Sequence, residues 1–346
     1  MLAAPADSAT AAVPTDPAAA AGVNGSATAD SAGDSATAER AGAVAALPDG
    51  TSLFASPTTR DHVGRVVAPV TINGKGPFRF IVDTGANHST ISLGLAQTLG
   101  LRPTEVPSVV LDGITGSAQV SFVTVDRLQA GDLILQDEPL PVVSGEFMAG
   151  ADGVLGAAGF TTKSLMVDFQ HNRVAISHGV TSTVRTASTK IHALRLTHGL
   201  IMLETRVGGV RVQAVVDTGS ERTLGNLALR NALHPPNRLG AVVQLTSVYG
   251  ATQELESGEI RPAPNIMVES LRITDAHIIY GDFHIFKVWN MNDRPALILG
   301  MDVLGTMPAL GIDFEKQDVY LVGVRPQGAS AWSTNQGVMA DQVQKK

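Results

Sequence analysis

Short runs of apolar and β-branched residues, bounded by Gly, Asn and Asp, recur along most of the chain. Two long stretches, "GRVVAPVTINGKGPFRFIVDTG" and "GLIMLETRVGGVRVQAVVDTG", each read as two strands joined by a Gly-containing turn. Helical periodicity is brief and is confined to segments such as "LGLAQTLGL", "LALRNAL" and "MDVLGTM". The pattern predicts a mainly β protein with short helices.

Each two-strand stretch leads into an aspartate, and the same sequence features follow the two aspartates in the same order. Asp83 in "FIVDTG" is followed 134 residues later by Asp217 in "AVVDTG". Each aspartate is followed after 33 residues by a glycine, Gly116 or Gly250, and later by an apolar run into glycine, "GVLG" or "LILG". Each copy closes with two strands joined by a polar turn. This duplication predicts two similar lobes related by a pseudo-twofold axis.

The repeat and the composition divide the chain into five predicted segments. Residues 1–59 are rich in Ala and Ser and too poor in large apolar side chains to offset their chain entropy, so we expect them to be disordered. The remaining segments are a first lobe at 60–178, a Ser/Thr-rich linker at 179–194, a second lobe at 195–325 and a flexible tail at 326–346.

Charge and composition narrow the range of partners. The 346-residue chain has a net charge of -7 and no Lys/Arg cluster, which argues against nucleic acid and anionic membrane surfaces as partners. No apolar run approaches the roughly 18 residues of a membrane helix. Cysteine is absent, so disulfides and thiolate nucleophiles are excluded. We expect a periplasmic or exported protein because the Ala/Ser/Pro-rich lead suits a tether, and a cytoplasmic location is the alternative because no clear signal peptide is present.

A carboxylate at the end of a buried strand is costly unless it is paired or used. If the axis brings Asp83 and Asp217 together, their carboxyl groups share a single proton and form a general acid beside a general base. The ionised member then activates a water for attack on a peptide carbonyl, while the protonated member later protonates the leaving nitrogen. This chemistry requires no metal or other cofactor, and the nine histidines show no metal-ligand spacing.

The repeated apolar-apolar-Asp-Thr-Gly motif, the hairpin after it and the later apolar-apolar-Gly run resemble the aspartic protease superfamily of pepsin and the retropepsins. The resemblance covers about residues 60–324, and the lobes are similar to the retropepsin-like lobes of bacterial proteins. It implies a bilobal acid-protease fold, a polypeptide substrate held in the cleft between the lobes, and a monomer with both lobes in one chain. The catalytic residues that it implies are Asp83 and Asp217.

The neighbours of the two aspartates receive supporting roles. Residues expected to support the active-site loops are Thr84, Gly85, Thr218, Gly219 and Ser220. Substrate contacts are expected at Asn87, Glu221, Gly116, Tyr249 and Gly250, the last three in hairpins that resemble flaps.

The two copies differ three positions after each aspartate, where Ala86 stands in the first and Ser220 in the second. Because only Ser220 has a side-chain donor, we predict that Asp217 is the more readily ionised partner and that Asp83 holds the proton.

The sequence leaves two functions open, an active aspartic endopeptidase and a catalytically inactive peptide-binding module on the same fold. Retention of both aspartates and both motif glycines favours catalysis. Asp168 and Asp313 are expected to shape the turns of closing hairpins, and Asp302 is expected to cap a helix, so none of them is predicted to be catalytic.

Overall fold

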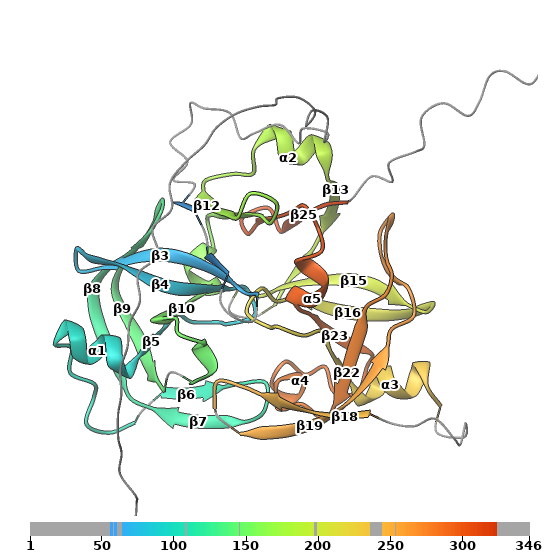
Figure 1. Cartoon of the computed structure of the whole chain (residues 1–346), viewed down its shortest axis with the longest axis horizontal. Coiled ribbons are helices and arrows are strands. Elements are labelled where there is room, and N and C mark those ends of the chain that lie inside the picture. The colour runs from blue at the N-terminus through green and yellow to red at the C-terminus, as the bar shows by residue number, and fades with distance from the viewer. Residues whose placement is uncertain are drawn as a thin grey trace, which may run out of the picture. The chain divides into compact units, whose positions relative to one another are not determined.

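The computed structural model describes residues 56–57, 59–60, 64–107, 109–144, 146–196, 199–235, 244–252 and 254–323, which belong to one compact unit. The predicted fold class is confirmed, because the described part of the chain is mainly β and the two repeats form two β lobes of the acid-protease type (Figure 1). A third sheet joins the two repeats on one side of the lobes.

The first lobe is a closed barrel. Its strands, in order around the barrel, are β3 (Val66–Ile72), β4 (Lys75–Asp83), β10 (Gly153–Gly156), β5 (Thr90–Ser92), β9 (Leu133–Val143) and β8 (Phe122–Ala130), with β2 (Thr59–Arg60) at the edge of β3. A pairing between β3 and β8 closes the ring. Strand β10 runs parallel to β4 and places Gly156 opposite Asp83, so the catalytic candidate stands where two parallel strands end.

Side-chain alternation explains the barrel interior. Val66, Ala68, Val70 and Ile72 lie on one face of β3 and are buried in the large apolar core, whereas Val67 faces a smaller cluster on the other side. Helix α1 (Leu93–Leu99) follows β5, and the Ser92 hydroxyl caps it by accepting from the Leu95 N–H at 3.0 Å. Two short 3-10 helices are η1 (Glu146–Met148) and η2 (Ala157–Phe160).

The second lobe has the same strand plan but does not close. Its main sheet runs in the order β18 (Gln244–Tyr249), β19 (Leu255–Pro262), β22 (His277–Gly281), β17 (Leu224–Asn226), β23 (Ala296–Leu299), β16 (Val210–Val216), β15 (Ile201–Val207), β20 (Ile266–Val268) and β21 (Leu271–Ile273), with β14 (Leu194–Arg195) beside β15. The counterpart of β8 is divided into β19, which pairs with β22, and β20, which pairs with β15. This division leaves the sheet open. Helix α3 (Leu227–Leu233) packs against β16, β17, β22 and β23 of this sheet. Helix α4 (His284–Val288) adds Ile285 and Phe286 to an apolar cluster with residues of the same sheet, and helix α5 (Met301–Leu304) adds Met301 and Leu304 to the large core.

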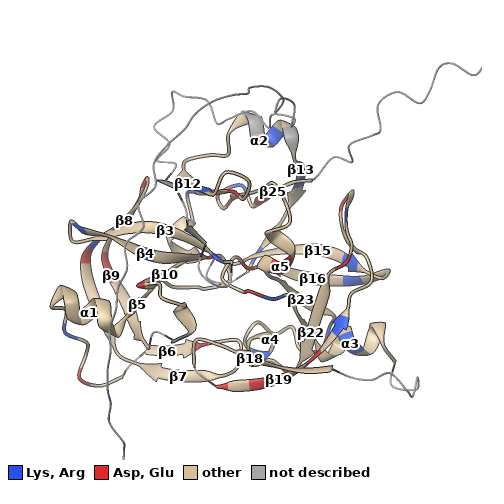
Figure 2. Ribbon diagram, in the orientation of Figure 1, with Lys and Arg blue, Asp and Glu red and all other residues tan. Residues whose placement is uncertain are grey.

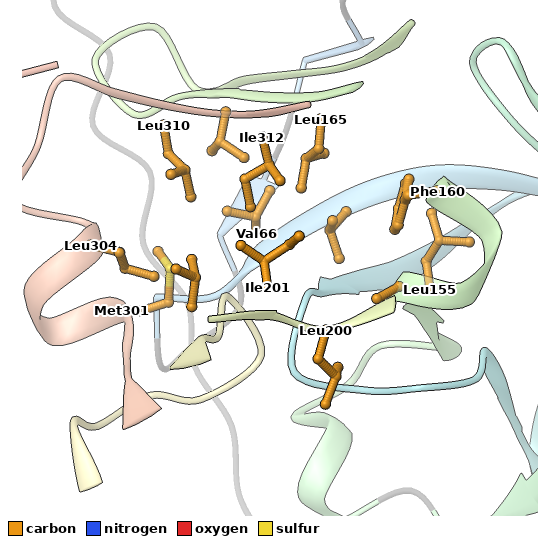
Figure 3. Close-up of a cluster of buried hydrophobic side chains, with 14 of the residues drawn as sticks. Val66, Leu155, Phe160, Leu165, Leu200, Ile201, Met301, Leu304, Leu310 and Ile312 are labelled. Carbon is orange, nitrogen blue, oxygen red and sulfur yellow. The ribbon is translucent and has the colours of Figure 1, made fainter. Parts of the chain in front are cut away.

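A six-stranded sheet is shared by the two repeats. Its order is β1 (Ser56–Pro57), β12 (Arg173–Ser177), β11 (Ser164–Asp168), β24 (Ala309–Asp313), β25 (Asp318–Val322) and β13 (Thr189–His192). Strands β11 and β24, one from each repeat, pair antiparallel with Met166 opposite Gly311. The core beneath the sheet draws Leu155 and Phe160 from the first repeat and Leu304 and Leu310 from the second (Figure 3).

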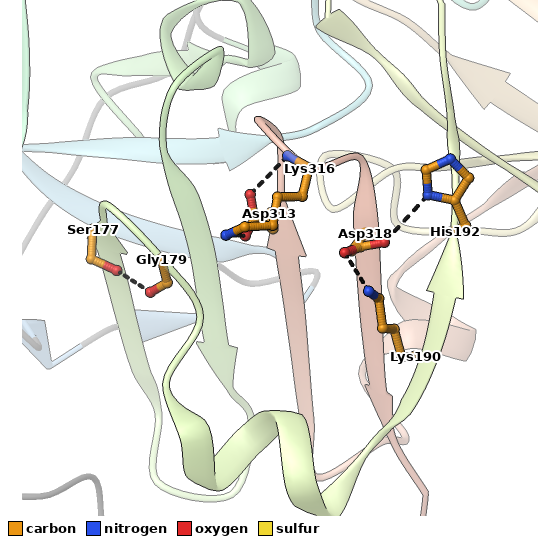
Figure 4. Close-up of polar contacts among 7 residues, drawn as sticks. All are labelled: Ser177, Gly179, Lys190, His192, Asp313, Lys316 and Asp318. Atoms are coloured by element: carbon orange, nitrogen blue, oxygen red, sulfur yellow. Dashed lines mark hydrogen bonds and ion pairs between the residues drawn. The ribbon is translucent and has the colours of Figure 1, made fainter.

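The ends of this sheet are tied by charged side chains (Figure 4). The Asp318 carboxylate, which is almost fully buried, accepts from Lys190 at 2.8 Å and lies 3.3 Å from His192 Nδ1, fastening β13 to β25. Asp313 accepts from the Lys316 N–H at 3.0 Å, and Asp168 accepts from the main chain of its own turn. These two aspartates therefore shape turns.

The segment boundaries differ in two places from those read in the sequence. Strands β1 and β2 begin before residue 60, inside the stretch expected to be disordered, and the rest of 1–59 and the tail at 326–346 lie outside the described residues. The linker at 179–194 holds helix α2 (Ser182–Ala187) and strand β13, because it delivers an edge strand to the shared sheet.

Charged residues are distributed along many elements of the ribbon rather than gathered on one (Figure 2). Within the described ranges, no helix is both long and apolar enough to cross a bilayer.

Candidate active site

Asp83 and Asp217 occupy matching positions at the ends of β4 and β16, where each begins a tight loop. Asp83 Oδ1 accepts from the N–H groups of Gly85 and Ala86, both at 2.9 Å. Asp217 Oδ1 accepts from the N–H groups of Gly219 and Ser220 at 2.8 and 3.0 Å. Each carboxyl group lies against the motif glycine of the opposite loop, and the two groups are close enough to shift each other's pKa. The structure thus brings together the two aspartates that the repeat singled out.

The threonines after the aspartates lock the two loops together. Thr84 Oγ1 donates to the Val216 carbonyl at 2.7 Å, and Thr218 Oγ1 donates to the Val82 carbonyl at 2.6 Å. The Thr84 hydroxyl oxygen also accepts from the Thr218 main-chain N–H at 3.1 Å, and the Thr218 hydroxyl oxygen accepts from the Thr84 main-chain N–H at 3.2 Å. Both side chains are fully buried. This reciprocal set of bonds fixes the two carboxyl groups relative to each other.

Replacing Thr218 by Val is expected to destabilise the protein by about 2 kcal/mol or more, because the change leaves the Val82 carbonyl and the Thr84 N–H buried without partners. Denaturant unfolding monitored by circular dichroism measures the loss. Thr98→Val is the matched control, since the Thr98 hydroxyl bonds only to its own exposed helix. Equal unfolding midpoints for the two variants would contradict a structural role for the reciprocal threonine bonds.

Gly85 and Gly219 are required for a reason that the sequence does not reveal. Neither has a positive φ, so no left-handed turn demands glycine there. Instead, a Cβ added at Gly85 would overlap the Asp217 carboxyl group, and one added at Gly219 would overlap that of Asp83. Each glycine therefore makes room for the aspartate of the opposite lobe.

Burial sets the protonation of the pair. It raises the pKa of Asp217 well above its usual value, and the nearby Asp83 carboxylate raises this pKa further. The pKa of Asp83 is also raised by burial, but the hydrogen bond from Asp217 and the charge of Arg65 oppose the rise. Asp217 is 5% exposed, whereas Asp83 is partly open to solvent. These directions favour a proton on Asp217 over one on Asp83.

The structure contradicts the contact on which the sequence-based prediction of the proton holder rested. The prediction relied on a side-chain bond from Ser220 to Asp217, but Ser220 Oγ donates to the Arg222 carbonyl at 2.8 Å. Only the Ser220 main chain reaches the carboxylate, as the Ala86 main chain does in the first lobe. The pKa directions differ mainly because the interaction between the two carboxyl groups raises the pKa of Asp217 and lowers that of Asp83, and the charge of the buried Arg65 lowers the pKa of Asp83 further.

The raised pKa of Asp217 makes stability depend on pH. A carboxyl group that is more basic when folded stabilises the protein below the unfolded pKa of about 3.9, and this contribution is lost as the pH rises through the folded pKa. We expect Asp217→Asn to unfold at higher denaturant concentration than the wild type at pH 7, with the gap closing near pH 3.5. Asp126→Asn is the control, because Asp126 is exposed on β8. A gap that is equal at both pH values would contradict the assignment.

The two predicted flap hairpins meet at their tips. The first consists of β6 (Val109–Asp112) and β7 (Ser117–Val120), and the second of β18 and β19. Gly116 and Gly250 lie in the two turns, and a Cβ added at Gly250 would lie 2.7 Å from Thr115 Oγ1. Leu111 of the first hairpin packs against the same small apolar cluster of the first lobe as Ala86 of the Asp83 loop. Tyr249, by contrast, is 69% exposed, so its ring faces solvent.

The residues four positions past the aspartates differ in their side-chain contacts. Asn87 Oδ1 is buried and has no hydrogen-bond partner among the described residues, which leaves an acceptor unused close to Asp83. Glu221 is exposed and pairs with Arg222 at 3.2 Å. Asp302 is not the predicted helix cap, because it accepts from Thr223 Oγ1 at 2.7 Å and from the Thr223 N–H at 3.1 Å, while Gly300 holds the cap position.

Sequence reasoning missed Arg65. It precedes β3 in the first lobe, its guanidinium donates to the Phe147 carbonyl at 2.9 Å, and its charge acts on Asp83. Leu200 stands before β15, the matching strand of the second lobe. An alignment of the two repeats identifies Arg65 as unusual, because this charged residue of the first repeat corresponds to the apolar Leu200 of the second.

No group of three or more His, Asp or Glu side chains is placed to hold a metal ion in the described ranges. A search of curated proteins finds no match. A family model described as aspartyl protease matches residues 68–158 and 203–303, one region in each repeat and together more than half of the chain. The chain therefore belongs to the aspartyl protease family.

Proposed function

We propose that the protein is an aspartic endopeptidase in which Asp83 and Asp217 activate a water molecule to hydrolyse peptide bonds. The observation that carries this proposal is the close approach of two carboxyl groups, one from each repeat, each lying against the motif glycine of the other repeat and each with a raised pKa. Two carboxyl groups in such contact cannot both ionise readily, so the pair retains one proton. A singly protonated pair supplies a base and an acid to the same reaction centre.

The two aspartates take different roles in this proposal. The Asp83 carboxylate accepts a proton from the water as its oxygen attacks the peptide carbonyl carbon. Asp217 donates its proton to a hydrogen bond with the carbonyl oxygen, which gains negative charge in the transition state. The proton taken by Asp83 then passes to the leaving nitrogen when the C–N bond breaks. The carbonyl carbon is attacked by water itself, so the proposal contains no acyl-enzyme.

The surrounding residues hold this geometry. The reciprocal threonine bonds fix the loops, and the motif glycines leave space for the opposite carboxyl groups. The unused Asn87 Oδ1 is proposed to accept a main-chain N–H of an extended polypeptide, as an added strand would provide. The two hairpins are proposed to cover the substrate. We propose that a monomer suffices, because one chain supplies both aspartates.

The proposal is tested by incubating the full-length protein with casein between pH 3 and pH 7 and identifying new peptide termini by mass spectrometry. We expect cleavage in the acidic range, inhibition by a statine-type peptide, and a decline as the pH rises past the raised pKa of Asp217. Peptide binding without any new termini at any pH would favour the inactive binding module instead.

A further inference from the structure

The β6–β7 hairpin of the first lobe is attached to its own lobe more weakly than its counterpart. It forms a separate two-stranded sheet, because the ladder stops at Val120 before β8 begins at Phe122. In the second lobe, β19 continues without a break from the hairpin into its pairing with β22. An isolated two-stranded hairpin is marginally stable in water. Contacts from elsewhere must therefore keep β6–β7 in place.

Leu111 packs against an apolar cluster of the first lobe, but the contacts at the tip of the hairpin come from the second lobe. Ile114 at the tip packs against the apolar cluster that contains Phe283 and Ile285, and its carbonyl accepts from the Ile285 N–H at 3.4 Å. Thr115 Oγ1 lies 3.4 Å from Thr252 Oγ1, and Thr115 is 2% exposed. Helix α4 and the turn of β18–β19 thus hold the tip, and both belong to the opposite lobe (Figure 1).

A polar cluster lies at the base of the same turn. His284 Nε2, at the start of α4, is 2.8 Å from Ser117 Oγ and 3.2 Å from Asp112 Oδ1, and Ser117 Oγ donates to the same Asp112 oxygen. One nitrogen serves both partners, so the histidine does not relay a proton from serine to carboxylate as in a catalytic triad. Because the serine proton is directed to Asp112, the contact between Nε2 and Oγ requires a proton on Nε2.

We propose that His284 is a pH-sensitive latch that holds the β6–β7 hairpin of the first lobe against the second lobe. The proton on Nε2 is present in one neutral tautomer and in the imidazolium, but only the imidazolium adds a positive charge next to Asp112. Charge-assisted hydrogen bonds are about twice as strong as neutral ones. The latch is therefore tighter in mild acid, where histidine is charged and aspartate is still ionised, and looser at neutral pH.

Charged groups face His284 from the hairpin, the neighbouring turn and its own helix. Asp112 faces it from the hairpin, and the Glu254 carboxylate of the β18–β19 turn lies against Gly116, one residue before Ser117. On its own helix, Lys287 is engaged with Asp282 at 2.8 Å. His284 and Asp112 are 33% and 36% exposed, so solvent screens the pair and the effect is modest.

The consequence for activity depends on the proposed endopeptidase function. Because the hairpins are proposed to cover the substrate, we infer that the hold on the β6–β7 tip affects the access of a polypeptide to the dyad. His284 is thus a positioning residue, acting through the hairpin rather than on the peptide bond.

Hydrogen–deuterium exchange of the full chain without substrate tests the latch, so its outcome is independent of whether the protein cleaves peptides. The readout is the protection of peptides covering Leu111–Ala118 at pH 5.5 and pH 7.5, corrected for intrinsic exchange rates. We expect wild-type protection to be about two- to fivefold higher at pH 5.5. His284→Gln should lose this difference, and His284→Lys, which keeps a positive charge, should remain protected at both pH values.

Two further variants show whether a change in protection comes from the contact between His284 and Asp112 or from a general loss of stability. Asp112→Asn, on the other side of the contact, should match His284→Gln, whereas Lys287→Gln, on the same helix but not touching the hairpin, should match the wild type. A pH difference that persists in His284→Gln, or that disappears equally in Lys287→Gln, would overturn the proposal.

Discussion

Asparagine in place of either Asp83 or Asp217 is expected to reduce casein cleavage by at least about a thousandfold. Asparagine preserves the shape of the side chain and its acceptor for the loop N–H groups, but it neither ionises nor exchanges a proton. General acid–base catalysis contributes about 10²–10⁴ in rate, and each single variant removes one member of the pair. Initial rates at the wild-type pH optimum measure the effect.

Two controls show whether a lower cleavage rate reflects the loss of the chemistry or the loss of the folded state. Asp217→Asn is expected to be at least as stable as the wild type at neutral pH, so unfolding would not explain its inactivity. Asp126→Asn, on an exposed part of β8, should retain the wild-type rate. Rates within tenfold of the wild type in both dyad variants would exclude these aspartates from the chemistry.

Gly85→Ala is expected to reduce cleavage by about a hundredfold or more, although the added methyl group carries no charge. The new Cβ would overlap the Asp217 carboxyl group and force it away from Asp83. Misplacement of a catalytic group by about 1 Å costs on the order of 10² in rate. Gly219→Ala should act in the same way, since its Cβ would overlap Asp83.

Gly94→Ala is the matched control for the glycine variants. Gly94 lies in α1 with no neighbouring atom near its added Cβ and has no positive φ, so alanine should leave the rate unchanged. The kinetic effect of Gly85→Ala should appear mainly in kcat, because the chemistry is disturbed more than peptide binding. Full activity of both motif alanine variants would show that the carboxyl groups are not packed against the opposite glycines.

The repeat made much of the fold and the pairing of the aspartates predictable from the sequence. Two copies of one strand pattern, each ending at Asp-Thr-Gly, require matching lobes, and a carboxylate at the end of a buried strand requires a partner. The turn roles of Asp168 and Asp313 also followed from local sequence. The expected periplasmic or exported location remains a prediction from the sequence alone.

Other features depend on contacts between distant residues. The space that Gly85 leaves for Asp217 involves opposite lobes, and the direction of the Ser220 hydroxyl is decided by a nearby carbonyl that sequence spacing does not identify. The division of the β8 counterpart into β19 and β20 follows from pairings with two different strands. The contact between His284 and Asp112 joins residues 172 positions apart, and no local pattern predicts it.

The central claim is that the two repeats contribute one carboxyl group each to a single reaction centre. The most direct test compares the casein cleavage rates of Asp83→Asn, Asp217→Asn and the double variant under identical conditions. Residues that act as one unit have strongly non-additive effects, so we expect the double variant to be no slower than either single variant. Two singly substituted proteins that each retain a large part of the rate, with a further loss only in the double variant, would contradict a shared centre.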